Sequence, residues 1–149
     1  MSGQFKNTFS ADLTKYMDRA KNRTNAFVRE FTQDMAQEIV TNTPRDTGFA
    51  QNSWYAMLNN VTTYTPAPSG FDDSKGKATY PHSGVPFAAM AMTLDNAVAG
   101  DTVYLLNNCS YIHVLENGYG GRPARNFVKG ALSRMDQIAN DVLKRIGAE

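Results

Sequence analysis

The sequence contains one cysteine, Cys109, so no disulfide can form within the chain. It is therefore unlike the small disulfide-stabilised domains of secreted proteins. It also lacks an apolar run long enough for a signal peptide at its start or for a bilayer-spanning helix further on. These absences lead us to expect a soluble protein made in a reducing compartment, with no membrane contact.

Charged residues are scarce, at 19% of the chain, and 15 basic residues against 14 acidic ones leave a formal net charge of +1. Nucleic-acid-binding domains and proteins of acidic membrane surfaces normally show a clear basic excess. A nucleic-acid-binding module is therefore only a third hypothesis for this chain. The 149 residues, 42% of them hydrophobic, are enough for one domain with an ordinary core.

Hydrophobic periodicity predicts three helices and two short strands in a single domain, residues 1–149. A long N-terminal helix is expected over 10–42, where apolar residues recur at spacings of three and four, and Pro44 ends it. At 1.5 Å per residue this helix is about 45–50 Å long. Because that exceeds what a small core needs, either the helix bends around the core or part of it bridges to a neighbouring subunit. The other predicted elements are a strand over 53–58, with Trp54 as a core anchor, a helix over 86–99, a strand over 102–106 and a helix over 124–146.

Between the first strand and the middle helix, residues 59–85 show no sustained period and are punctuated by prolines and glycines. Loops of this length inside a compact domain are uncommon and are usually functional or disordered. Tyr64, Phe71 and Tyr80 are spread along the segment, and a purely solvating linker would not need aromatics. We therefore predict a long mobile loop that becomes ordered against a partner, with these three aromatics at the contact.

Residues 111–132 combine a glycine-rich turn with two arginines that flank Pro123. Arg122 and Arg125 are expected where the final helix begins, and there the helix dipole disfavours cations by a few tenths of a kcal/mol. We therefore expect a compensating carboxylate, either Glu116 within the chain or one on a partner. An intrachain ion pair at a surface contributes at most about 1 kcal/mol, whereas between subunits the arginine fork recognises carboxylates well.

Groups suited to catalysis are few. His113 and Glu116 lie three residues apart, which suits two metal ligands on one helical face, but no second matching pair exists. A thiol nucleophile would need Cys109 with a histidine as its base. Cys109 is better explained as a small apolar residue, because it follows a strand that is expected to be buried. No phosphate loop, dinucleotide fingerprint or nucleophile elbow occurs. We predict no enzyme activity, cofactor or metal; the rival hypothesis is a small metal-dependent hydrolase that uses His82, His113 and Asp72.

Three blocks follow one another along the chain: residues 43–48 (TPRDTG) with 52–54 (NSW), residues 103–118 (VYLLNNCSYIHVLENG), and residues 122–132 (RPARNFVKGAL). The first resembles the pattern TPxDTGxLxxSW, the second a VY-NN-x-YAxxLExG segment, and the third a PARPFLxxAL close. In this order the blocks are similar to those of the HK97 gp10-like family of tailed-bacteriophage neck and tail-completion proteins. Asn117 stands where the family often has an aromatic, and Asn126 where it often has proline.

The resemblance implies a structural virion protein, assembled in the host bacterial cytoplasm and located at the head–tail junction. It implies an α+β subunit, in which a small antiparallel sheet is packed by a long N-terminal helix, a middle helix and a C-terminal helix. It also implies a homo-oligomeric ring, six- or twelvefold, that completes the tail or joins it to the head. A tail terminator ring that controls tail length is the alternative within this class. DNA would pass through the channel without specific binding. The residues expected to contact neighbouring subunits, connector proteins or tail-tube proteins are Arg45, Asp46, Tyr64, Phe71, Tyr80, Glu116, Arg122 and Arg125.

Overall fold

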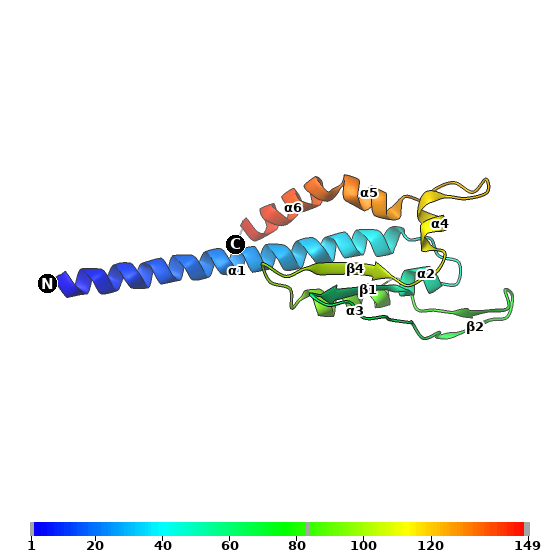
Figure 1. Ribbon diagram of the computed structural model, residues 1–149, viewed down its shortest axis with the longest axis horizontal. Helices are drawn as coiled ribbons and strands as arrows, with labels where there is room; N and C mark the ends of the chain where they lie inside the picture. The colour runs from blue at the N-terminus through cyan, green and yellow to red at the C-terminus, as the bar shows by residue number, and fades with distance from the viewer. Residues whose placement is uncertain (1, 83, 148–149) are drawn as a thin grey trace.

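The computed structural model describes residues 2–82 and 84–147, and the fold is α+β, as predicted. The helices are α1 (Ser2–Asn42), α2 (Phe49–Asn52), α3 (Gly84–Leu94), α4 (Ile112–Asn117), α5 (Phe127–Ser133) and α6 (Met135–Gly147). The strands are β1 (Trp54–Leu58), β2 (Gly70–Asp72), β3 (Lys77–Thr79) and β4 (Val103–Asn107). Figure 1 shows α1 between the α5–α6 pair on one side and the β1–β4 sheet on the other.

Helix α1 is the axis of the molecule, and only its C-terminal part belongs to the body. It ends at Asn42, as predicted, but it begins at Ser2 rather than at residue 10. Residues from Met35 to Val40 include four that are buried in the core, whereas residues 9–24 are all exposed. Figure 1 shows this exposed half extending beyond the rest of the chain. The alternative in which α1 bends around the core is therefore wrong.

The sheet joins β1 to β4 in antiparallel register, from Trp54 opposite Asn107 to Leu58 opposite Val103. Trp54 is the predicted core anchor, and the structure confirms it. Its indole N–H donates to the Thr43 hydroxyl at 2.9 Å, and its ring meets Phe127 edge-on with centroids 6.3 Å apart. The same side chain thus links the end of α1, the sheet and α5.

Residues 59–85 are not a loop without secondary structure, contrary to the prediction. β2 and β3 form an antiparallel hairpin, with Gly70 opposite Thr79, and Gly76 takes a φ of 61° in its turn. Strands of three residues are too short to display an alternating pattern in the sequence. Whether the segment is mobile before it meets a partner stays a prediction.

Two helices differ in extent from their predicted ranges. α3 ends at Leu94 instead of residue 99, because the N–H groups of Val98 and Ala99 donate to side chains of Asp101 and Asn25 rather than to helix carbonyls. The final helix is interrupted at Arg134 and so forms α5 and α6.

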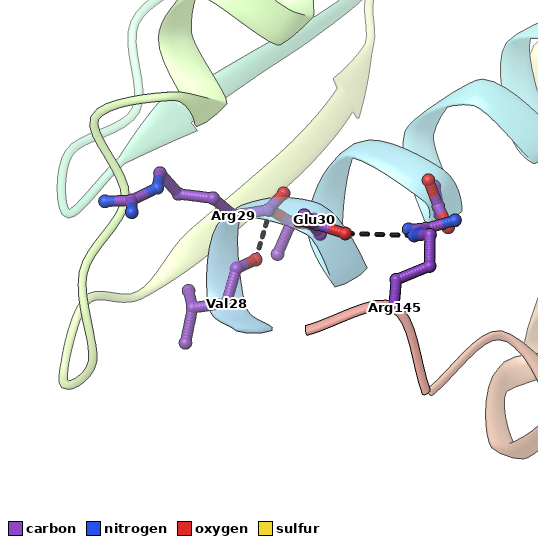
Figure 2. A network of polar contacts seen from close by, with 6 residues as sticks. Val28, Arg29, Glu30 and Arg145 are labelled. Carbon is purple, nitrogen blue, oxygen red and sulfur yellow. Dashed lines mark hydrogen bonds and ion pairs between the residues drawn. The ribbon is translucent and has the colours of Figure 1, made fainter. Parts of the chain in front are cut away.

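Helix α6 is attached to α1 by arginine–carboxylate pairs. Arg145 lies 3.0 Å from Glu30 and 2.7 Å from Asp34, and Arg134 pairs with Glu38 at the other end of the contact. Figure 2 shows Arg145 reaching Glu30, while Arg29 points to the other side of α1. The carboxylates of α1 in the body are thus already paired, by Arg145 of α6 and by Arg134 just before it.

Candidate partner-binding surfaces

Four of the eight predicted contact residues line one hollow of about 430 Å³. Arg45, Asp46, Arg122 and Arg125 come together there with Lys77, and the wall is completed by the 44–50 turn, Tyr111 and Leu115. Four cations against one carboxylate make this hollow electropositive. We call it the basic hollow.

Two of these residues hold the β2–β3 hairpin against the 43–48 turn. The Arg45 guanidinium donates to the backbone oxygens of Tyr80 at 2.8 Å and Pro81 at 2.7 Å. Asp46 pairs with Lys75 and, at 3.3 Å, with Lys77, and these hydrogen bonds lower the pKa of its carboxyl below 3.8. Both side chains therefore have partners within the chain, and their contact with another subunit stays a prediction.

Glu116 has a role that the sequence did not indicate. Its carboxylate accepts from the backbone N–H groups of Val128 at 3.0 Å and Lys129 at 2.8 Å, in the first turn of α5. Asn126, at the N-cap position, has a φ of 51° and makes no side-chain cap bond, so Glu116 supplies the cap. A carboxylate does lie at this helix N-terminus, as expected, but it binds the helix and forms no ion pair with the arginines among the described residues.

Arg122 and Arg125 lie on the loop before α5, not in its first turn as predicted. The Arg125 N–H donates to the Leu115 oxygen at 3.0 Å, and the loop turns through Gly118 at a φ of 77°. A Cβ at Gly118 would lie 2.6 Å from the Arg122 carbonyl oxygen, so the tight closure needs glycine. In the described part of the chain, no hydrogen bond or ion pair involves either arginine side chain. Both guanidinium groups thus remain available at the basic hollow.

The three predicted contact aromatics do not form one cluster. Tyr80 packs on Phe49 with ring centroids 5.2 Å apart, beside the basic hollow. Phe71 is exposed on the hairpin, which lies at the opposite end of the molecule from the start of α1 (Figure 1). Tyr64 packs on Tyr55 at 5.7 Å and lines a different hollow.

The sequence analysis did not predict the second hollow, which Tyr64 lines. It measures about 440 Å³ and lies between β1, residues 62–67 and α3, and none of the described residues that line it is charged. We call it the apolar groove. Its signal in the sequence is α3 itself, whose residues GVPFAAMAMTL include no charge.

The projecting half of α1 is a further exposed surface, and the sequence analysis predicted no contact residues on it. Phe9, Leu13, Tyr16 and Met17 are exposed there and share one helical face by their spacing. The spacing of these apolar residues can be seen in the sequence. Whether another element covers the helical face that they form depends on the tertiary structure.

The residues of the hydrolase hypothesis do not form a metal centre in the described part of the chain. No group of three histidine, cysteine, aspartate or glutamate side chains is placed to hold an ion there. The side chain of Asp72 lies outside the described residues.

Cys109 is buried, as expected. Burial of Tyr111, together with a hydrogen bond to Cys109, raises the pKa of Tyr111 to about 12. Among the described helices, none combines the length and the apolar character needed to cross a bilayer.

Several positions in the resemblance blocks have internal roles. Thr43 accepts from the indole of Trp54, and Gly48, with a φ of 91°, sits against the Arg45 guanidinium. Asn52 donates to the oxygens of Gly48 and Pro81.

Comparison of the chain with protein-family models, with curated proteins and with solved structures finds no match.

Proposed function

We propose that this chain is a structural virion protein of a tailed bacteriophage that forms a homo-oligomeric ring at the head–tail interface, where it completes the tail or joins it to the head. The observation that carries the proposal is the projecting half of α1. Residues 9–24 contribute nothing to the core of their own subunit, and all of them are exposed.

A projecting helix of this kind has no stabilising role within one subunit. In proteins most of the stability of a helix comes from packing of its apolar face rather than from helix propensity. Here four large apolar side chains lie on such a face and meet solvent. A partner that covers this face would supply the missing stabilisation, which supports a role in assembly.

The basic hollow supports the proposal independently. The side chains of Arg122 and Arg125 make no hydrogen bond or ion pair within the described chain, yet a closed loop holds them beside Arg45 and Lys77. Arginine forks in such a position suit carboxylates on a neighbouring subunit or on an adjoining ring.

Electron microscopy of lysates from a phage with this gene disrupted tests the proposal. A joining role predicts filled heads beside separate tails of normal length, and a terminator role predicts overlong or irregular tails. Supplying the wild-type gene in trans is the control and restores normal particles. Intact, infectious particles in the disrupted strain would overturn the proposal.

A further inference from the structure

The outer face of α3 is an apolar surface that no other element of the described chain covers. A helix that is apolar on all sides is normally buried on all sides, and α3 has no charged residue. One side of it packs against β1 and α1, whereas Val85 and Met92 on the other side are 56% and 74% exposed. Ala88 and Ala89 lie between them and are also exposed, so a second helix can approach this face closely. Val85 and Ala89 also line the apolar groove, which extends the face.

The stripe on the projecting half of α1 matches this face in size and character. Phe9, Leu13, Tyr16 and Met17 are between 47% and 72% exposed, which leaves on the order of 500 Å² of largely apolar side-chain surface uncovered. A standard protein–protein interface covers about 800 Å² per partner, somewhat more than half of it apolar. The stripe alone therefore supplies the apolar part of such an interface.

The two surfaces cannot meet within one chain. α1 is continuous from Ser2 to Asn42 and has no hinge to fold back. Arg23 and Thr24 still lie beside α6, and from there residues 9–22 run about 21 Å away from the body. Figure 1 shows α3 lying along the sheet, with the projecting half of α1 leading away from it. Contact between them requires a second copy of the chain.

Charge favours this pairing over contact between two projecting helices. Residues 9–24 carry four basic and two acidic side chains, a net charge of +2, and Lys15, Arg19 and Arg23 follow one another at every fourth position. Residues 78–115 have no lysine or arginine and contain two carboxylates, Asp95 just after the C-terminus of α3 and Asp101. A helix C-terminus is itself electronegative. The basic helix is thus attracted to the α3 face and repelled by another copy of itself.

We propose that residues 9–24 of one subunit dock along the outer face of α3 and the adjoining apolar groove of the next subunit. The contact is heterologous, since one surface meets a different one, and repetition of such a contact builds a ring where the rotation between copies closes and an open filament where it does not. This inference deepens the proposed function, on which it rests for the existence of a ring, and it names the two surfaces that build the ring.

Two substitutions each remove one side of the contact. Met17→Glu places a charge in the stripe, and Met92→Glu places one on the α3 face; burying either charge without a partner weakens self-association at least about tenfold. Each variant alone is expected to sediment as a monomer, while the wild-type protein forms a closed oligomer. Asn22→Glu, on the opposite side of the projecting helix, and Leu132→Glu, at an exposed apolar site on α5, are the matched controls and keep the oligomer. Circular dichroism and a cooperative unfolding transition confirm that each variant folds.

Mixing the two broken variants separates this pairing from its rivals. The intact helix of the Met92→Glu chain can dock on the intact face of the Met17→Glu chain, so an equimolar mixture gives a 1:1 complex in native mass spectrometry and nothing larger. Oligomers that survive Met92→Glu would overturn the inference, and so would their loss in Leu132→Glu. A wild-type chain that stays monomeric at high concentration would overturn it too. Gene disruption tests the virion role separately, so failure of the docking surfaces and failure of the proposed function give different results.

Discussion

Replacing Glu116 tests how the basic hollow is built. The carboxylate of Glu116 accepts two backbone N–H groups in the first turn of α5, at 2.8 and 3.0 Å. Loss of an N-cap costs about 0.5–2 kcal/mol, and loss of a negative charge at a helix N-terminus costs about 0.3–1 kcal/mol. These terms overlap, so Glu116→Ala is expected to lower the free energy of unfolding by about 1–2 kcal/mol.

Urea and thermal unfolding measure this change. For a chain of this length, a loss of about 1–2 kcal/mol lowers the melting temperature by roughly 2–8 °C. Glu116→Gln retains one acceptor but not the charge, so it is expected to fall between wild type and alanine. Amide hydrogen exchange of Val128 and Lys129 should accelerate most, because these are the groups that lose their acceptor.

Replacing Arg122 or Arg125 gives stability changes that can be compared with the loss in Glu116→Ala. If Glu116 served to pair with Arg122 and Arg125, replacing either arginine by alanine would cost as much stability as replacing Glu116. The structure places the carboxylate on α5 instead, so Arg122→Ala and Arg125→Ala are expected to change stability by less than about 0.5 kcal/mol. Equal losses in all three variants, or no loss in Glu116→Ala, would refute the assignment of Glu116 as the cap.

Three further predictions concern the core, the hairpin and the basic hollow. Thr43→Val leaves the indole N–H of Trp54 buried without its acceptor, at a cost of about 1–3 kcal/mol in urea unfolding, whereas Thr43→Ser should keep most of the stability. The hydrogen bonds that lower the pKa of Asp46 stabilise the hairpin fully above the unfolded pKa of 3.8, and this contribution is lost as the pH falls through the lower folded value. An NMR titration in which the Asp46 carboxyl had a midpoint at or above 3.8 would contradict the pairing. Arg122→Glu combined with Arg125→Glu should block assembly and leave the circular dichroism spectrum unchanged, and normal incorporation into particles would remove the proposed role of the arginines.

The parts of the fold that the sequence predicted depend on local signals. Pro44 stops α1 at Asn42 by a local steric effect, and Trp54 is the kind of large apolar residue that a core recruits. The predicted start of α1 was too late, at Ser10. In the structure its carbonyl accepts from the Thr14 hydroxyl inside a continuous helix, and no glycine or proline interrupts the chain there.

The parts that could not be predicted depend on partners distant in sequence. Glu116 caps α5 only because the loop between them closes through Gly118 and because Asn126 adopts a left-handed backbone conformation. The hairpin from Gly70 to Thr79 is held by Arg45 and Asp46, which lie more than twenty residues earlier. The spacing of residues along α1 shows a stripe, but only the packed structure shows that nothing in the described chain covers its first half.

The central claim is that this chain is a ring-forming subunit, and native mass spectrometry of the purified full chain, supported by negative-stain images, tests it most directly. A ring-forming subunit is expected to give a closed assembly of six or twelve copies that persists on dilution and dissociates when Met17 is replaced by glutamate. A monomer at every concentration, or an oligomer unaffected by that substitution, would contradict it.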